Sequence, residues 1–230
     1  MHLVIIVPAY NETQHLGRVC RGLFEQNSRL TELGFKRITT VVVDDGSTDA
    51  TAEIARCEGA VVIRHPLNRG QGAALETGDE YARVIGADVA VHFDADGQFN
   101  PGDVAPAVQA LLTSGKEVIL GSRWLGRPAR GVPFVKRILL RTVGRWFTYL
   151  QTGVWLTDFH NGFRVFNRRA LSLIRLTHDG MAHNAEIIAA LRRHRLTFAE
   201  WPVEVTYHEY GQGVRGGAKI FWDLLWENFR

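Results

Sequence analysis

Short apolar runs alternate with amphipathic segments through the first half of this 230-residue chain. The apolar runs, rich in valine and isoleucine, occupy residues 3–7, 38–43, 61–64, 87–94 and 117–121. Between them, apolar residues recur at helical spacing over 17–33, 51–57, 70–84 and 101–112. Continuous apolar runs are typical of strands buried on both faces, and short strand-to-helix loops favour right-handed crossovers. The pattern predicts an α/β fold, with a mostly parallel sheet flanked by helices.

Helical periodicity is again present later in the chain. It covers about 134–150, begins once more at 168 and ends near 193, before a predicted strand over 197–205. The final segment, 218–230, follows a glycine-rich stretch and carries an apolar stripe made of Phe221, Trp222, Leu225, Trp226 and Phe229. Such a stripe can pack internally, pair with another chain or lie on a bilayer. We therefore expect C-terminal amphipathic helices beside the sheet.

Polar residues gather where three predicted strands end. Pro8-Ala9-Tyr10-Asn11-Glu12 follows the first strand, Asp44-Asp45-Gly46-Ser47-Thr48-Asp49 the second, and Asp94-Ala95-Asp96-Gly97-Gln98 the fourth. Carboxyl ends of parallel strands meet at one edge, where open α/β sheets bind ligands, so these residues are expected to share a site. Carboxylates there suit Mg²⁺ or Mn²⁺, which take further ligands from substrate phosphates. Helix capping and turn formation are the structural alternative for Asn11, Ser47 and Asp49.

Composition limits the class of protein. The chain is 46% hydrophobic and 22% charged, as in ordinary globular proteins. Cys20 and Cys57 lie in predicted helices without paired spacing, so we expect reduced, buried thiols of a cytosolic protein. The first apolar run lacks a basic region before it, and no run approaches the roughly 18 residues of a membrane-spanning helix. A cytoplasmic chain that does not cross a membrane is expected.

Charge is distributed unevenly around the net value of +3. Residues 1–100 hold 9 basic and 14 acidic residues, whereas 101–230 hold 18 basic and 10 acidic residues. No acidic residue occurs from 118 to 157, and the basic residues there are Arg123, Arg127, Arg130, Lys136, Arg137, Arg141 and Arg145. A basic, aromatic helix over 134–150 is typical of contact with an anionic membrane surface. A core-packed helix with a solvated basic edge is the alternative, and no nucleic-acid-binding motif accompanies the charge.

Four motifs, in this order and spacing, closely resemble glycosyltransferase family 2. They are Pro8-Ala9-Tyr10-Asn11-Glu12, residues 43–51, Asn68-Arg69-Gly70 and Asp94-Ala95-Asp96-Gly97-Gln98. Gly121-Ser122-Arg123, Asp158 with Gly162-Phe163-Arg164, and Glu186 narrow the resemblance to dolichyl- and polyprenyl-phosphate sugar synthases. The resemblance spans almost the whole chain. It implies a GT-A fold, a nucleotide-sugar donor of the GDP-mannose or UDP-glucose type, and inversion at the sugar carbon.

The resemblance also implies roles for individual residues. Nucleotide-sugar binding is assigned to Pro8, Tyr10, Asn11, Glu12, Val43, Asp45, Gly70, Asp94 and Ala95. Asp96 and Gln98 are assigned to Mg²⁺ or Mn²⁺, and Asp158 and Arg123 to catalysis. Contacts to the acceptor phosphate are assigned to Arg123, Lys136, Arg137, Arg215 and Lys219. The chain departs from the family pattern at Gln71, where lysine is frequent, at Leu140, where serine is common, and at His208, where arginine is expected.

The implied organisation is one GT-A catalytic domain over 1–230. Residues 1–115 would form its nucleotide-sugar-binding half, and 116–230 its acceptor-binding half, with interfacial helices at about 134–150 and 218–230. The expected reaction moves a hexose to polyprenyl or dolichyl phosphate at the cytoplasmic face of the membrane, where the enzyme would be peripheral. A lipid phosphate is already anionic, whereas a sugar hydroxyl would need a base such as Asp158 or Glu186. A transferase for a polysaccharide or other soluble acceptor, and a non-catalytic nucleotide-sugar-binding protein, are the alternatives; the sequence makes no prediction of the oligomeric state.

Overall fold

The computed structural model describes residues 1–125, 149, 153–159, 161–180 and 182–206. The predicted interfacial helices over 134–150 and 218–230 lie outside the described residues, apart from Tyr149. The same holds for four predicted acceptor-phosphate residues, namely Lys136, Arg137, Arg215 and Lys219. Those predictions therefore stay predictions.

Seven strands form one mixed sheet in the order β3-β2-β1-β4-β6-β5-β7. The strands are β1 (His2–Ala9), β2 (Arg37–Asp44), β3 (Val61–Arg64), β4 (Val89–His92), β5 (Val118–Ser122), β6 (Arg164–Asn167) and β7 (Phe198–Pro202). Strands β1 to β4 pair in parallel, as do β5 and β7. Strand β6, which the sequence pattern did not predict, runs antiparallel between β4 and β5. The mostly parallel sheet confirms the predicted fold class.

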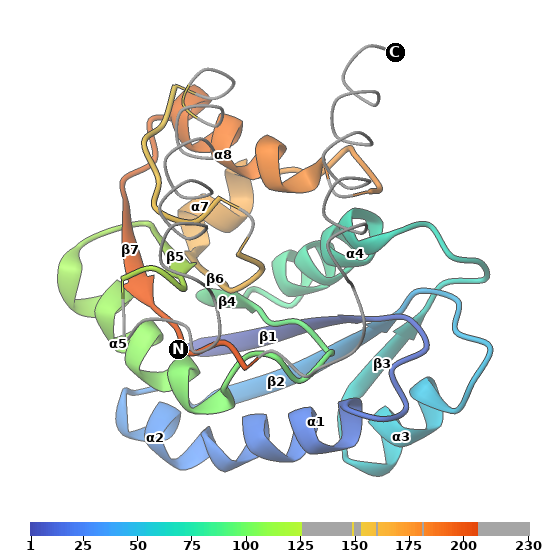
Figure 1. Ribbon diagram of the computed structural model, residues 1–230. Coiled ribbons are helices and arrows are strands. Elements are labelled where there is room, and N and C mark those ends of the chain that lie inside the picture. The colour runs from blue at the N-terminus through green and yellow to red at the C-terminus, as the bar shows by residue number, and fades with distance from the viewer. Residues whose placement is uncertain (126–148, 150–152, 160, 181, 207–230) are drawn as a thin grey trace, which may run out of the picture.

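Helices cover both faces of the sheet. They are α1 (Leu16–Glu25), α2 (Asn27–Glu32), α3 (Thr51–Cys57), α4 (Gln71–Val84), the 3₁₀ turn η1 (Pro101–Asp103), α5 (Val104–Ser114), α7 (Arg168–Leu173) and α8 (His183–Arg193). Figure 1 shows α1, α2 and α3 below the sheet and α4, α7 and α8 above it. The helix expected over 17–33 is two helices, because the chain turns at Gln26 between α1 and α2.

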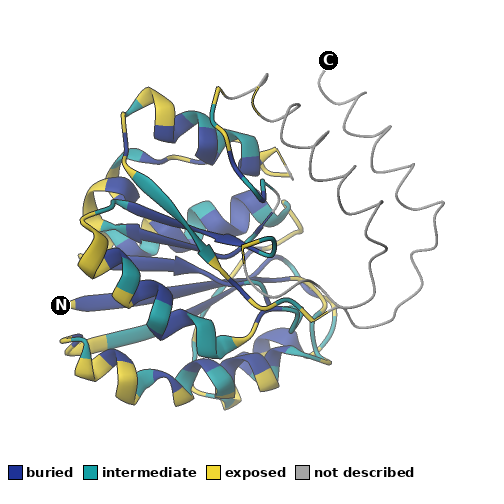
Figure 2. Ribbon diagram, turned by 60° about the vertical axis from the view of Figure 1, so that its left-hand side comes forward, coloured by how far each residue is buried: buried dark blue, intermediate teal, exposed yellow. Residues whose placement is uncertain are grey.

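Strand β1 shows why its sequence is apolar at every position after His2. Leu3, Ile5 and Val7 pack in the core that contains α1 and α5, whereas Val4 and Ile6 pack in the core that contains α4 and α8. All five side chains are fully buried, and the central strands are dark blue in Figure 2. A strand between two cores has no solvent face, so period-2 alternation is lost.

Two further expectations concern the thiols and the membrane. Both cysteines are free; Cys20 is buried in α1, as predicted. The prediction of burial is wrong for Cys57, because the short helix α3 ends at this residue and leaves it exposed. Within the described ranges, no helix combines the length and apolar character needed to cross a bilayer.

Candidate active site

The polar loops after β1, β2 and β4 meet around a cavity of about 460 Å³. Parallel register brings them together, because Ala9 at the end of β1 lies beside Asp44 at the end of β2, and Ile6 lies beside His92 at the end of β4. The lining residues are Pro8, Ala9, Tyr10, Glu12, Asp45, Asn68, Gly70, Gln71, Ala74, Asp94, Ala95 and Asp96. The cavity therefore lies where the strand-end motifs were expected to meet.

All residues assigned to the nucleotide sugar line this cavity except Asn11 and Val43. Val43 is fully buried in the core of β2. Asn11 adopts a left-handed φ of 55°, and its Oδ1 accepts a hydrogen bond from the Thr48 N–H at 3.0 Å. The Asn11 N–H donates to Ser47 Oγ at 2.9 Å. Asn11 thus fastens the first strand-end loop to the second and does not cap α1.

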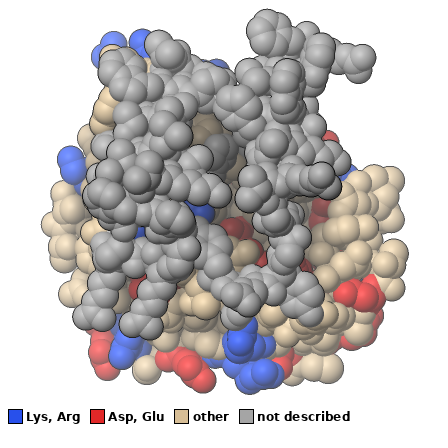
Figure 3. Space-filling view, viewed as in Figure 1, with Lys and Arg blue, Asp and Glu red and all other residues tan. Residues whose placement is uncertain are grey.

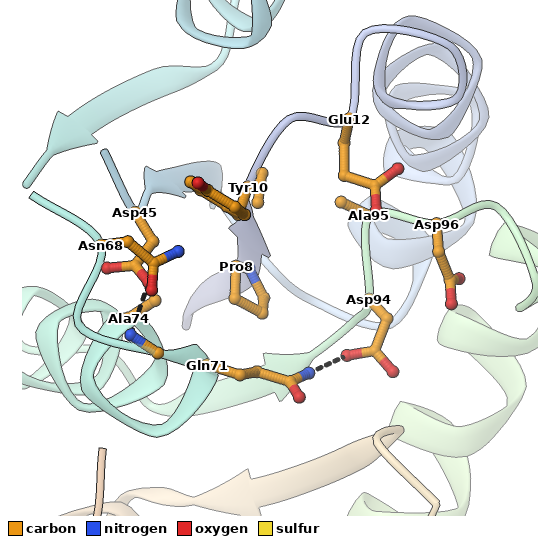
Figure 4. Close-up of a pocket in the computed structure, with 12 residues that line it drawn as sticks. Pro8, Tyr10, Glu12, Asp45, Asn68, Gln71, Ala74, Asp94, Ala95 and Asp96 are labelled. Atoms are coloured by element: carbon orange, nitrogen blue, oxygen red, sulfur yellow. Dashed lines mark hydrogen bonds between the residues drawn. The ribbon is translucent and has the colours of Figure 1, made fainter. Parts of the chain in front are cut away.

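One end of the cavity is organised by Asp45, as Figure 4 shows beside Tyr10 and Asn68. The buried Asp45 carboxylate accepts hydrogen bonds from the backbone N–H groups of Arg69 (3.0 Å) and Gly70 (2.7 Å). His65 Nδ1 lies 2.6 Å from Asp45 Oδ1. Asp45 therefore fixes the 68–70 loop against the end of β2, and the ring of Tyr10, 46% exposed, lies open above it.

The other end of the cavity holds Glu12, Asp94 and Asp96, and acidic side chains are visible at the centre of this face in Figure 3. Burial, followed by the Asp96 charge, raises the pKa of Asp94 to about 6, and the same two causes raise the pKa of Glu12. Asp96 Oδ1 accepts a hydrogen bond from the Gln98 N–H at 2.9 Å, whereas no described donor reaches Oδ2. The Gln98 side chain does not line the cavity.

These carboxylates fit a hard divalent cation. They repel one another, a cation would relieve that repulsion, and Asp96 keeps one oxygen available for it. No three His, Cys, Asp or Glu side chains in the described part of the chain are arranged to hold an ion by themselves. Mg²⁺ and Mn²⁺ commonly take their other ligands from water and substrate phosphates, so a partial protein set is suitable for them.

Asp94 is held in place more tightly than its neighbours. Gln71 Nε2 donates a hydrogen bond to Asp94 Oδ1 at 2.8 Å. On the other side, a β-carbon on Gly162 would lie only 2.2 Å from Asp94 Oδ2, so the glycine permits a close approach that any side chain would prevent. Gly162 belongs to the Gly162-Phe163-Arg164 motif, which predicted no role for the glycine itself.

The two predicted catalytic residues form a buried ion pair. Arg123 donates to Asp158 through Nε (2.7 Å), Nη2 (2.8 Å) and its backbone N–H (3.0 Å). Asn161 Nδ2 adds a further hydrogen bond at 3.2 Å. Burial raises the pKa of Asp158, but the hydrogen bonds and charge of Arg123 outweigh it, so the pKa lies below its usual range. Asp158 is therefore a poor proton acceptor.

Glu186, the other predicted base, is similarly occupied. Its carboxylate accepts hydrogen bonds from the backbone N–H groups of Thr177 (2.8 Å) and His178 (3.2 Å). Burial raises the pKa of Glu186, but these hydrogen bonds and one from the Thr177 hydroxyl lower it further than burial raises it. Glu186 thus holds the backbone of residues 177 and 178, in the loop before α8, against the first turn of that helix.

A buried polar cluster lies behind the cavity. His92 Nε2 donates to Asp79 Oδ1 at 2.9 Å, and Arg164 donates to Asn184 Oδ1 of α8. His183 Nδ1 donates to the Gly180 carbonyl at 2.8 Å. Burial lowers the pKa of Arg164 to about 10 and that of His183 to about 4. At pH 7 the arginine is charged and the imidazole of His183 is neutral.

His183 predicts an acid-sensitive fold. Its folded pKa of about 4 is below the ordinary 6.5, so the unfolded chain binds the extra proton more readily. The stability penalty is absent above about pH 6.5, grows as the pH falls and is complete below about pH 4, at about 3 kcal/mol. Denaturant unfolding of wild type and His183→Asn at pH 4 to 8 measures it, because the difference between the curves isolates this residue. Two parallel curves would contradict the prediction.

A sequence model of Glycosyl transferase family 2 matches residues 4–174, a range that contains every cavity-lining residue together with Arg123 and Asp158. The chain belongs to this family. It is a glycosyltransferase, and the enzyme class that the motifs implied is confirmed.

Named relatives cover nearly the whole glycosyltransferase. It is 37% identical to an uncharacterised protein of Methanocaldococcus jannaschii, over 97% of this chain and 90% of the relative. It is 31% identical to the UDP-N-acetylglucosamine–dolichyl-phosphate N-acetylglucosaminyltransferase of Methanococcus voltae, over 97% and 94%. It is 27% identical to the polyprenol monophosphomannose synthase of Mycolicibacterium smegmatis, over 94% and 82%. These matches support the narrower resemblance to polyprenyl-phosphate sugar synthases.

Solved structures share the fold of this glycosyltransferase. Glucosyl-3-phosphoglycerate synthase of Mycobacterium tuberculosis, crystallised with Mn²⁺ and UDP-glucose, matches with a TM-score of 0.67 at 22% identity. The match covers 94% of this chain and 74% of that one. At this identity the likeness concerns the fold, and it confirms the expected GT-A-like architecture.

Several residues of the glycosyltransferase site were missed from sequence. Ala9, Asn68, Gln71 and Ala74 line the cavity without having been assigned to it. The Asn68-Arg69-Gly70 motif was a sufficient signal for Asn68 and the adjoining Gln71. Arg164 belongs to the Gly162-Phe163-Arg164 motif, but its burial and its partners in the cluster were not predicted, because arginine is mostly exposed in folded proteins.

Proposed function

We propose that this glycosyltransferase moves a hexose from a nucleotide sugar, of the GDP-mannose or UDP-glucose type, to polyprenyl or dolichyl phosphate. The observation that carries the proposal is the occupied Asp158 carboxylate, which accepts hydrogen bonds from Arg123 and Asn161 and has a lowered pKa. A hydroxyl acceptor needs a base, whereas a phosphate reaches the site as an anion and needs mainly to be oriented. Relatives named for dolichyl phosphate and polyprenol support the same acceptor.

The donor would occupy the cavity lengthwise. Its nucleoside would lie at the end formed by Tyr10, Asp45 and Asn68, and its diphosphate would point toward Asp96. Asp96 and Gln98 would hold Mg²⁺ or Mn²⁺, which supplies neutralisation of the charge that develops on the leaving diphosphate. Attack from the face opposite the diphosphate would invert the sugar carbon. Metal-bearing and UDP-glucose-bearing crystals of a protein with this fold are consistent with that arrangement.

The acceptor phosphate would meet Arg123 at the mouth of the site. About one quarter of the Arg123 side chain is exposed, while its partner Asp158 is almost completely buried. Asp158 would therefore hold the guanidinium in a fixed orientation toward the phosphate. Lys136, Arg137, Arg215 and Lys219 remain proposed phosphate contacts, and the segments around them would place the enzyme peripherally on the cytoplasmic face of the membrane.

Ligand-induced thermal stabilisation tests the donor class. UDP, GDP and their mannose, glucose and N-acetylglucosamine conjugates are compared with Mn²⁺, Mg²⁺ or a chelator present. A ligand at about 100 times its dissociation constant adds about 2.7 kcal/mol, or several degrees in Tm, so one nucleotide series should stabilise the protein in a metal-dependent way. No stabilisation by any nucleotide with either metal would oppose a nucleotide-sugar transferase.

Gly162→Ala is expected to raise the dissociation constant for the donor by roughly 10- to 100-fold, as second-layer changes at metal sites do. The added methyl group would overlap Asp94 Oδ2 and force the carboxylate to move. Calorimetric titration with the best donor and Mn²⁺ measures the effect. Gly180→Ala is the matched control, because a β-carbon there would meet no atom within 4 Å. Equal donor affinity in Gly162→Ala and the control would show that the position of Asp94 is unimportant.

A further inference from the structure

Arg164 at the start of β6 is an unusual residue for a protein core. It is 2% exposed, and it is among the largest fully buried side chains of the described residues. A buried charge is costly unless it is paired and hydrogen-bonded. One side of the guanidinium donates to Asn184 of α8, but Nη1 has no hydrogen-bond partner among the residues that the structure describes. Some other interaction must therefore account for the buried charge.

The acidic groups whose charges act on Arg164 are Asp94, Asp79 and Asp158. Two of them have nearer partners, since Asp79 accepts from His92 and Asp158 from Arg123. Asp94 accepts a hydrogen bond from Gln71, a neutral amide, and Arg164 is the largest opposite charge acting on it. The guanidinium is thus the strongest positive charge acting on Asp94, and it acts without a direct hydrogen bond between the two described side chains.

The register of two strands places Arg164 behind Asp94. In the antiparallel pair of β4 and β6, Arg164 lies directly opposite His92. Continuing two residues past this pair brings Asp94 opposite Gly162, in agreement with the very close approach of these two residues. Asp94 therefore lies just beyond the end of β4, between Gln71 and Gly162. Arg164 is opposite His92, which is two residues before Asp94 in the chain.

We propose that Arg164 is a positioning residue for sugar transfer, which holds the Asp94 carboxylate in its donor-facing orientation from a fixed place in the core. Asn184 restrains the guanidinium, so α8 supports the donor end of the cavity through this contact. The inference rests on the proposed function, because Asp94 must face the nucleotide sugar for its orientation to affect catalysis. Arg164 itself does not contact the donor, because its side chain is buried.

Steady-state kinetics and donor binding test this role in Arg164→Met, Arg164→Lys and their combinations with Asp94→Asn. Arg164→Met is expected to raise the KM and the dissociation constant for the donor by roughly 10- to 100-fold, with a smaller change in kcat. Arg164→Lys, which keeps the charge, should recover most of the donor affinity. In the Asp94→Asn background, Arg164→Met should have little further effect, because the two residues act as a unit. Arg168→Met, an exposed arginine paired with Asp88, is the matched control.

Additive losses in the double variant, at unchanged Tm, would overturn the positioning role. If Arg164→Met does not fold, Asn184→Leu replaces it, because this change keeps the charge and removes its restraint. Asn184→Leu should weaken donor binding in the wild-type background but have little further effect in the Asp94→Asn background. An equal loss of donor affinity in both backgrounds would overturn the positioning role of Arg164. If the wild-type protein binds no nucleotide sugar, the proposed function is refuted instead. If it binds the donor but transfers no sugar to lipid, the donor affinities of the Arg164 variants, with and without Asp94→Asn, still decide the positioning role.

Discussion

Asp96→Ala is expected to lower kcat/KM for sugar transfer by about 1000-fold, or about 4 kcal/mol of transition-state stabilisation. Asp96 lines the cavity and no described donor reaches its Oδ2, so this oxygen is the proposed metal ligand at the diphosphate. Loss of this ligand leaves the leaving-group charge without its neutralising ion. Initial rates measured over a range of Mn²⁺ concentrations, with donor saturating and limiting, quantify the loss.

Asp88→Ala provides the control for Asp96→Ala. Asp88 precedes β4 at the opposite end of the strand and pairs with exposed Arg168, so its removal should leave transfer and its metal response nearly unchanged. The account would be contradicted if Asp96→Ala kept metal-stimulated transfer within about tenfold of wild type, since a first-layer metal ligand is worth several kcal/mol. Asp96→Ala should unfold near the wild-type temperature, because the Asp96 carboxylate accepts one backbone hydrogen bond in the described structure.

Asp158→Asn is expected to lower kcat/KM by about 100-fold and the free energy of unfolding by about 3 kcal/mol. The neutral amide cannot reproduce the two-point ion pair with Arg123, which leaves a largely buried guanidinium without its counterion. The estimate is at the low end for a broken buried pair because one quarter of the Arg123 side chain is exposed. Denaturant unfolding and initial-rate kinetics measure the two effects.

The pH profile separates orientation from base catalysis in Asp158→Asn. Because the pKa of Asp158 is lowered, we expect its carboxylate to stay ionised through the working range and to act by orientation, not as a base. The variant should therefore be slower at every pH, with a profile of the same shape as that of wild type. Disappearance of an acid limb in the variant would identify Asp158 as the base and favour a hydroxyl acceptor. Glu53→Gln, which breaks the exposed pair with Arg56, is the control and should cost less than about 1 kcal/mol.

The fold was predictable for elements whose burial is evident from their own sequence pattern. Strand β1 is apolar from Leu3 to Ala9 because both faces are covered, and this run without alternation distinguishes it from a solvent-facing strand. Strand β6 was not predictable, because it is four residues long and begins with Arg164. The burial of an arginine depends on Asn184 and Asp94, which are brought near it only by the completed sheet.

The site was predictable to a similar extent. Parallel strands must end at a common edge, so the motifs after β1, β2 and β4 were correctly expected to meet. Val43, assigned from the family resemblance, precedes Asp44 in β2 with its side chain in the core, so its contact with the donor stays a prediction. The pairing of Arg123 with Asp158 could not be derived, because the two residues lie on separate loops and their contact depends on the tertiary fold. That contact is the observation on which the proposed acceptor rests.

The most direct measurement of the central claim is the partition of transferred sugar between water and organic solvent. Wild type is incubated with Mn²⁺, a radiolabelled nucleotide sugar chosen by thermal stabilisation, and polyprenyl phosphate in detergent micelles, with Asp96→Ala and a reaction lacking the lipid as blanks. The account predicts label in the organic phase that requires the lipid phosphate, the metal and Asp96. Label that appears only in water-soluble product, independently of polyprenyl phosphate, would contradict it.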